Sequence, residues 1–405
     1  MMSQTTIIPE ADMHKYLNTD LMFLNLGPSH PATHGAIRTF VALDGETIIA
    51  AVNEIGYLHR GFEKSVEVGT WNQVIPYTDR LNYCSAMMNN VGLAKAVEKM
   101  LDVQITERCI FMRVIISELS RIIDHLVCIA ANLVDMGALT NYWYLYNQRE
   151  YVYDFLSKLT GARLTNSFTR IGGMYHDFHE GWEVELEEML KKCETGTLES
   201  LTLVKKNRIF QDRTQDISCV SAAEALSHGF TGPCLRASGV GYDLRKDAPY
   251  YHYDQFDFEI PVGSKGDIYD RFMVRYEEIF QSMKIVRQAM KMIPGGSVNV
   301  DNPSVFLPNK SDVYSNIEAL MNHFKLIFDG VKVPAAELYD STEAANGELG
   351  FYMISDGSGH PYRIKVRPPC FYMMSAYADM VEGTMVADSV INLGSINIIA
   401  GELDR

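Results

Sequence analysis

The stretch from Thr106 to Leu139 constrains the fold most, because it is apolar around nearly the whole circumference of a helix. Such a helix is normally buried on most of its faces. Five polar residues nevertheless recur at spacings of three, four, seven and three, which places them on one narrow stripe: Glu118, Arg121, His125, Asn132 and Asp135. On a surface helix this stripe would be a solvated face or a set of salt bridges. Here we expect it to meet other buried polar groups and to include a functional residue, because unpaired buried charge is unfavourable.

The composition excludes several classes of function. The 405 residues suffice for one large domain or two to three average ones, and 47% hydrophobic residues suffice for a core. A net charge of −15 argues against a nucleic-acid groove, which needs a basic face. Residues 1–20 carry no basic segment followed by an apolar one, and no run of about eighteen apolar residues occurs, so we expect neither export nor a membrane span. Any membrane contact would then be peripheral or made through a partner.

The seven cysteines are scattered through the sequence, and no two form a C-x-x-C pair. Zinc ribbons and most iron–sulfur sites need clustered thiolates. An odd number of cysteines in mostly apolar surroundings is typical of reduced thiols in the cytosol. We therefore expect this chain to bind no metal or cluster of its own.

Hydrophobic periodicity predicts an α+β architecture in which distant segments converge on one site. We expect a polar extension over residues 1–20 and one domain over 21–405, which is β-rich at 21–70, mainly helical at 71–230 and mixed at 231–405. The first part should hold a small sheet with a hairpin turn at Asp44-Gly45. Long helices should follow over 71–159.

The second half of the sequence predicts further helices and one hairpin. Helices are expected over 183–230, 267–292, 311–328 and 375–390, with an irregular acidic segment over 250–266. Ser311 is the predicted N-cap of the third of these helices, since its hydroxyl can accept from a free backbone N–H. The hairpin should pair 349–354 with 362–366 around the turn Asp356-Gly357-Ser358-Gly359.

The segment 25–35 carries two histidines on a loop that cannot be helical. His30 and His34 lie four residues apart, but Pro28 and Pro31 exclude the helix that would make them a metal pair. A stiff loop with two imidazoles can deliver protons or hydrogen bonds to a ligand. The alternative is a tight turn in which the histidines cap nearby backbone groups. A zinc hydrolase using both histidines would need a third ligand.

Three ordered motifs resemble a known family. They are Leu26–Gly35 (LGPSHPATHG), Gly56–Lys64 (GYLHRGFEK) and Ser355–Arg367 (SDGSGHPYRIKVR), and the sequence finishes with GELDR at 401–405. All four are similar to the 49 kDa subunit, also called the D subunit, of respiratory complex I, the proton-translocating NADH:quinone oxidoreductase. The resemblance covers nearly the whole sequence beyond residue 20, and it implies the fold of the nickel–iron hydrogenase large subunit.

The resemblance also argues against hydrogenase activity. In hydrogenases two C-x-x-C pairs hold the metal centre, whereas here Asn82 and Ser85 stand at the first pair and Ile399 and Glu402 at the second. A nickel–iron centre needs four soft thiolates. In the family that this sequence resembles, the vacated site is part of a quinone cavity.

The resemblance assigns roles to individual residues. His34 and Tyr83 match the pair that hydrogen-bonds the quinone headgroup, and Asp135 matches the acid that orients this histidine. Nothing in composition or spacing singles out Tyr83, which by itself reads as a core tyrosine. Arg60 matches the arginine beside the terminal 4Fe-4S cluster of a neighbouring subunit, where a cation raises the cluster's electron affinity. His30 and Arg121 complete the residues that we expect to contact the cofactor.

Two positions depart from the family pattern. Many relatives have a histidine after the segment 161–163, where this sequence reads Leu164-Thr165-Asn166. If that histidine makes the cluster potential depend on pH, the dependence should be weak here. Ser29, where relatives often have glutamine, is a milder change.

The resemblance implies a subunit that is inactive alone and forms the quinone-reduction site with the iron–sulfur subunit of the complex, the B subunit. Electrons would come from NADH through FMN and iron–sulfur clusters on other chains. The C and I subunits and the H subunit of the membrane arm are the further expected partners, at the cytoplasmic side of the cell membrane. The main alternative is a scaffold in a hydrogenase-related membrane complex whose quinone site is vestigial.

Overall fold

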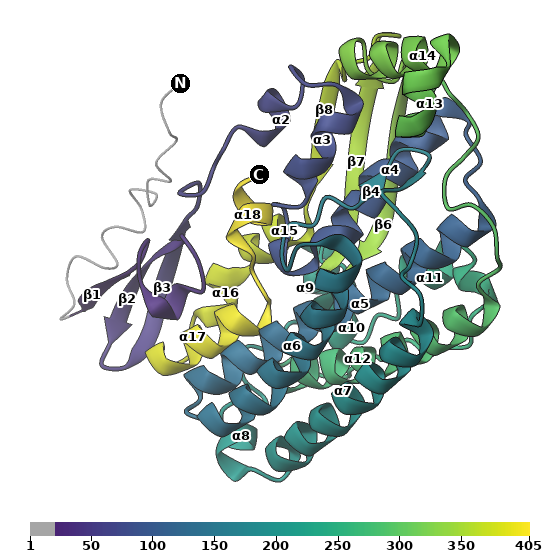
Figure 1. Cartoon of the computed structure of the whole chain (residues 1–405). Helices are drawn as coiled ribbons and strands as arrows, with labels where there is room; N and C mark the ends of the chain where they lie inside the picture. The colour runs from purple at the N-terminus through teal and green to yellow at the C-terminus, as the bar shows by residue number, and fades with distance from the viewer. Residues whose placement is uncertain (1–20) are drawn as a thin grey trace.

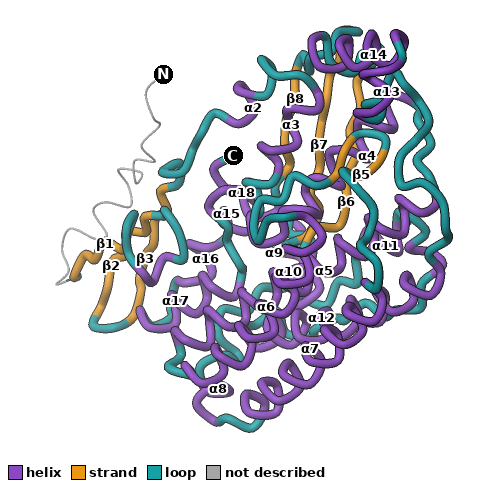
Figure 2. The backbone as a smooth tube through the Cα atoms, viewed as in Figure 1, coloured by secondary structure: helices purple, strands orange, loops and turns teal. Residues whose placement is uncertain are grey.

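The computed structural model describes residues 21–405 and confirms the α+β architecture, with a helical body and small antiparallel sheets (Figure 1). The polar extension expected over residues 1–20 lies outside the described residues. In the view of Figure 1 the helical body lies below the sheet β6–β8, the sheet β1–β3 lies at the left, and α18 lies between the two sheets. Figure 2 shows that loops connect most of these elements.

Four long helices form the helical body. They are α5 (Glu107–Asp135), α6 (Leu139–Thr160), α7 (Trp182–Lys205) and α12 (Ile268–Met292). Helix α5 begins where the Thr106 hydroxyl accepts from the Cys109 N–H, and it packs against both α6 and α12. Its apolar side chains form the centre of the largest hydrophobic cluster. Four members of the polar stripe are buried as expected, since Glu118, Arg121 and His125 have no exposed surface and Asn132 is 1% exposed. Asp135, at the end of the helix, is partly exposed.

The first sheet follows the sequence expectation. It comprises β1 (Met22–Leu26), β2 (Arg38–Asp44) and β3 (Thr47–Glu54), and the β2–β3 hairpin turns after Asp44 as predicted. Helix α16 (Tyr377–Val381) packs against β3, and α17 (Val386–Ser395) contacts the short 3-10 turn η1 (Pro31–Thr33). This sheet therefore holds the histidine loop between β1 and β2 against the last helices of the chain.

The second sheet contains the predicted hairpin and a strand that we did not predict. Strands β7 (Gly347–Ser355) and β8 (Arg363–Arg367) form the hairpin, and β6 (Ala336–Ala344) pairs with the other edge of β7. The Asn346-Gly347 dipeptide, a typical hairpin turn sequence, marks the β6–β7 connection and could have revealed β6. Helix α4 (Ala86–Leu101) packs against β6 and β7.

Two predicted helices are interrupted. The predicted helix 311–328 is two helices, α13 (Lys310–Ser315) and α14 (Ile317–Phe328). Ser311 is not an N-cap: Asn309 and Asn316 take those positions, and the Asn316 side chain accepts from the Glu318 N–H. The predicted helix 375–390 starts at the last residue of α15 (Pro369–Ser375) and is divided between α16 and α17, because Glu382 has a non-helical ψ of 134° and Gly383 adopts a φ of 76°.

The predicted helical stretch 183–230 is helical only in part. It contains the long helix α7 and the short helices α8 (Arg208–Asp212) and α9 (Ala222–Ser227), with non-helical residues between α8 and α9. The irregular segment 250–266 is confirmed apart from the 3-10 turn η3 (Tyr253–Gln255). The others are α2 (Phe62–Ser65), α3 (Trp71–Thr78), η2 (Tyr83–Ser85), β4 (Thr169–Arg170), β5 (Gly173–Met174), α10 (Gly232–Ala237), α11 (Leu244–Asp247) and α18 (Ala400–Asp404).

Candidate functional site

Segments that are far apart in sequence meet around α18. A Cβ added at Gly35 would lie 3.2 Å from the Ala400 Cβ, so the histidine loop contacts the start of this helix. A Cβ added at Gly401 would lie 2.6 Å from the Arg80 carbonyl oxygen and 3.5 Å from Cδ1 of Tyr83. At Gly401 only glycine allows so close an approach. Through the two contacts, the loop of His34 and the turn of Tyr83 both lie against one short helix.

His34 and Asp135 form a direct contact. The His34 Nε2 lies 2.6 Å from the Asp135 Oδ2, and the two side chains are 18% and 21% exposed. His34 follows the η1 turn in a left-handed conformation with a φ of 50°, and Asp135 is the last residue of α5. A carboxylate oxygen at this distance fixes the orientation of the imidazole. The outermost member of the polar stripe thus meets the loop that the prolines stiffen.

His30 and Arg121 make contacts within the chain. His30 is exposed, and its Nδ1 accepts a hydrogen bond of 3.1 Å from the Ala32 N–H as the N-cap of η1. Arg121 is fully buried, where its guanidinium contacts Glu118 and donates to the backbone carbonyls of Glu343 and Ala344. Each side chain therefore has a structural role: His30 caps η1, and Arg121 links α5 to the backbone at the end of β6.

Tyr83 lies in η2 with 38% of its surface exposed. Burial is the main cause of its raised pKa, and the nearby thiols of Cys84 and Cys370 and the Asp124 carboxylate raise that pKa further. The preceding residue, Asn82, accepts from the Cys84 N–H and so holds the turn in place. A phenol in this setting stays protonated at neutral pH and can donate a hydrogen bond or a proton to a ligand.

A buried polar cluster lies beneath Tyr83. The Asp124 carboxylate accepts hydrogen bonds of 2.9 Å from Asn82 and 2.8 Å from Asn397. Nearby, the Glu402 carboxylate accepts from the Cys370 N–H at 3.1 Å, and burial raises the pKa of Glu402 to about 7. Asp124 lies three residues after Arg121 and eleven before Asp135, at the edge of the polar stripe of α5, and the sequence analysis did not single it out. Its helical spacing and its charge on so apolar a helix could have indicated it.

No metal site is formed within residues 21–405, where no three His, Cys, Asp or Glu side chains are grouped to hold an ion. The four residues that the resemblance aligned with hydrogenase ligands are all buried: Asn82, Ser85, Ile399 and Glu402. Of these, Asn82 and Glu402 make the hydrogen bonds of the buried cluster. A hydrogen-bonded amide and carboxyl are not the soft ligands of a nickel–iron centre.

Arg60 lies on the exposed loop between β3 and α2, which Figure 2 shows as a loop segment. Its guanidinium donates to the carbonyls of Arg80 at 2.8 Å and Gly401 at 3.4 Å. Burial and then the neighbouring Arg80 lower the pKa of Arg60, so two cations share this face. The segment with Thr165 is adjacent, since Ser167 donates to the Asp79 carboxylate beside Arg80. Arg60 and Arg80 thus lie close together beside Gly401, which also approaches Tyr83.

Comparisons with known proteins identify the family of this chain. A family model described as "Respiratory-chain NADH dehydrogenase, 49 Kd subunit" matches residues 135–405. The C/D subunit of NADH-quinone oxidoreductase from Bdellovibrio bacteriovorus is 55% identical over 96% of this chain and 70% of its own length. The D subunits of NADH-quinone oxidoreductase from Pelobacter propionicus and Myxococcus xanthus are each 50% identical, over 95% and 98% of this chain respectively and 95% of their own lengths.

The chain is therefore a subunit of an oxidoreductase complex, and it has the hydrogenase-large-subunit-like fold expected from its sequence. Within that class, it belongs to the 49 kDa subunit family of NADH-quinone oxidoreductase, which is the D-subunit family of complex I. Over the described residues, no helix is long and apolar enough to cross a membrane.

Proposed function

We propose that this chain forms the quinone-reduction site of its complex, together with the iron–sulfur B subunit. The observation that carries the proposal is the convergence of the His34–Asp135 pair and the half-exposed Tyr83 on α18. Reduction of a quinone to a quinol needs two electrons and two protons. An imidazole and a phenol on opposite carbonyl oxygens can stabilise the developing negative charge and supply those protons.

Each residue of the proposed site has a distinct part. Tyr83, whose raised pKa keeps it protonated, donates to one carbonyl oxygen of the quinone. His34 donates to the other, while Asp135 holds the imidazole in its orientation. Arg60 presents a cation toward the terminal 4Fe-4S cluster of the iron–sulfur B subunit, where positive charge raises the cluster's electron affinity. His30 and Arg121 then act by shaping the loop and the helical body rather than by touching the quinone.

The proposed partners are the B, C and I subunits and the H subunit of the membrane arm. The C/D composition of the Bdellovibrio relative, in which the two subunits are one chain, supports a neighbouring C subunit. Electrons reach the site from NADH through FMN and iron–sulfur clusters on other chains, and their transfer to quinone drives proton translocation. The chain is then peripheral, on the cytoplasmic side of the cell membrane, and meets the membrane through its partners.

Replacement of Tyr83 by phenylalanine tests the proposal, because it removes one hydroxyl and little volume. We expect Tyr83→Phe to lower NADH:quinone reductase activity of membranes by about 100-fold, the scale of one general acid. Oxidation of NADH by an artificial acceptor that takes electrons upstream should be unchanged. Tyr362→Phe is the matched control, since Tyr362 is 65% exposed.

The outcomes separate the proposal from its alternatives. Selective loss of quinone activity would place Tyr83 at the quinone. If Tyr83→Phe kept both the quinone reductase activity and the artificial-acceptor activity, the proposed quinone site would be contradicted. A scaffold with a vestigial quinone site would then be favoured. A zinc assay on the purified complex addresses the hydrolase alternative, which requires zinc in a one-to-one ratio with this chain.

A further inference from the structure

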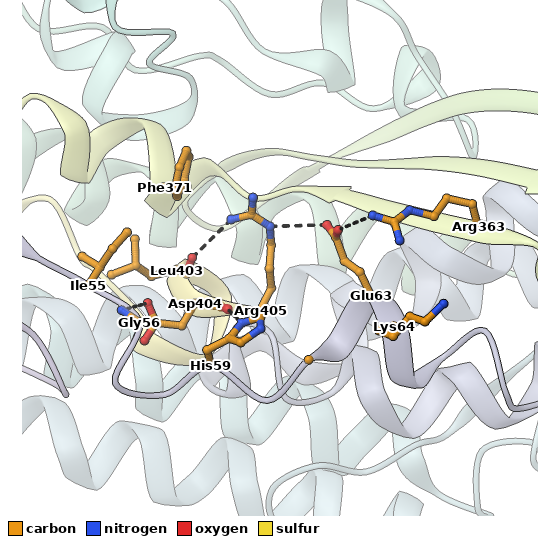
Figure 3. Close-up of a pocket in the computed structure, with 11 residues that line it drawn as sticks. Ile55, Gly56, His59, Glu63, Lys64, Arg363, Phe371, Leu403, Asp404 and Arg405 are labelled. Atoms are coloured by element: carbon orange, nitrogen blue, oxygen red, sulfur yellow. Dashed lines mark hydrogen bonds and ion pairs between the residues drawn. The ribbon is translucent and has the colours of Figure 1, made fainter. Parts of the chain in front are cut away.

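The loop that carries Arg60 is bound to the end of α18 by a set of hydrogen bonds (Figure 3). The two carboxylate oxygens of Asp404 accept from the backbone N–H groups of Gly56 at 2.9 Å and Leu58 at 2.7 Å. The Asp404 carbonyl lies 2.7 Å from Nδ1 of His59, which can donate to it. One residue of α18 thus contacts three positions of the loop.

The loop has few other means of holding its shape. Residues 55–61 form neither helix nor strand, and Gly56 and Gly61 have positive φ values of 110° and 63°. Tyr57 and Leu58 are 43% and 37% exposed, so little apolar surface is buried here. A segment with few apolar contacts depends on its hydrogen bonds for local stability.

Asp404 is well suited to hold this loop. It is 7% exposed, and a carboxylate that accepts two backbone N–H groups forms stronger bonds than a neutral acceptor. The far side of the loop is fixed separately, since Glu63 pairs with Arg405 at 3.5 Å and Arg363 at 3.4 Å. Between these two attachments Arg60 extends to the carbonyls of Arg80 and Gly401.

We propose that Asp404 is a positioning residue that holds the 55–61 loop through the N–H groups of Gly56 and Leu58 and thereby fixes the place of Arg60. The proposal rests on the function proposed above for Arg60. Loss of the Asp404 carboxylate should release the loop, move the Arg60 cation away from the neighbouring cluster and lower that cluster's midpoint potential.

The test uses Asp404→Ala and Asp404→Asn in the assembled, membrane-bound complex. The asparagine keeps one carbonyl acceptor and presents an amide group to the second N–H, so its effect should be intermediate and assembly should persist. The control is Asp379→Asn, which removes the same charge from a side chain that is 73% exposed. Arg60→Gln is the reference for loss of the cation itself.

The first readout is hydrogen exchange of the amides in residues 55–61. We expect exchange to be faster by about tenfold or more in Asp404→Ala, less in Asp404→Asn, and unchanged in the control. Unchanged exchange in Asp404→Ala would overturn the attachment itself.

The second readout is the midpoint potential of the terminal cluster, measured by electron paramagnetic resonance during redox titration. We expect Asp404→Ala to lower it in the direction of Arg60→Gln and by a smaller amount. A shift in Arg60→Gln without one in Asp404→Ala would overturn the positioning role. If Arg60→Gln itself leaves the potential unchanged, the proposed function of Arg60 fails, while the exchange result still decides whether Asp404 holds the loop.

Discussion

Glu402 shows how strongly the surroundings of one residue determine its chemistry. In this chain it is a fully buried carboxyl that faces Asp124 and accepts from the Cys370 N–H. Burial raises its pKa from 4.5 to about 7, so the carboxyl is partly neutral at physiological pH. The pKa of Asp124 is also raised, chiefly by burial. The site beneath Tyr83 therefore holds two carboxyl groups that resist ionisation.

Replacement of Glu402 by glutamine should change how stability depends on pH. Below about pH 4.5 the carboxyl is protonated in both the folded and unfolded states. As pH rises toward 7 the unfolded state ionises first, so the wild type loses stability, and the loss is complete above the folded pKa. Glutamine does not ionise, and its carbonyl still accepts from Cys370. Glu402→Gln should therefore gain stability relative to wild type between pH 5 and 8, by up to roughly 3 kcal/mol.

Melting temperatures of the assembled complex at pH 5.5, 7 and 8 measure this difference. The control is Glu382→Gln on the loop between α16 and α17, whose pH dependence should match that of the wild type. A constant difference between Glu402→Gln and wild type across this range would contradict a raised pKa for Glu402.

At the scale of elements, the sequence predicted structure well wherever local periodicity was strong. It predicted α5, α12 and the β2–β3 hairpin to within a few residues. It missed β6, because three of its nine residues are exposed and its neighbour β7 carried the clearer pattern. It also joined α13 to α14 and α16 to α17, although polar residues or glycine stand at both breaks, Ser315-Asn316 and Glu382-Gly383. Caps and positive φ values set those breaks, and they contribute little to hydrophobic periodicity.

Asn316 and Ser311 provide a direct test of the break in the predicted helix. Asn316→Ala removes the acceptor for the Glu318 N–H and should lower the stability of α14 by about 1 kcal/mol. Ser311→Ala lies within α13, makes no cap contact, and should change stability by less than about 0.5 kcal/mol. Hydrogen exchange of the α14 amides in both variants measures the two effects. Equal protection in both variants would show that Asn316 does not cap α14.

At the scale of the whole molecule, a network of buried ion pairs joins the helical body to the second sheet. Arg236 of α10 is fully buried and pairs with Glu278 of α12 at 2.5 Å and Glu343 of β6 at 2.8 Å. Glu278 also binds His125 of the polar stripe, at 2.7 Å. The sequence predicted that the stripe would meet buried polar groups. It could not identify these groups, because His125 and Glu278 are 153 residues apart and hydrophobic periodicity gives information only about residues close together in the sequence.

The same limit applies to the candidate site. Spacing placed Asp135 on the stripe and the prolines placed His34 on a stiff loop, but neither feature indicated that the two would touch across 101 residues. Tyr83 came only from the family resemblance, since one half-exposed tyrosine among 22 has no distinguishing local pattern. Its surroundings, Asp124 and α18, arise from tertiary packing alone.

Substitution of Arg236 tests the importance of the network. Arg236→Met keeps much of the side-chain length but leaves Glu278 and Glu343 without their shared cation. Removal of one partner from a buried ion pair typically costs about 3 to 5 kcal/mol, so we expect a large fall in melting temperature and poor assembly. Arg208→Met is the control, because the Arg208 side chain is 90% exposed and should contribute almost nothing. Comparable stability of the two variants would contradict a structural role for the network.

The attachment of Asp404 to Gly56 has a consequence for synthesis of the chain. The two residues are 348 positions apart, so the loop leaves the ribosome long before its acceptor exists. At about 5–20 residues per second, the interval is roughly 20 to 70 seconds. During that time the histidine loop and the arginine loop lack the helix that will order them. The face that carries Arg60 and His34 is therefore among the last parts of the described residues to become ordered.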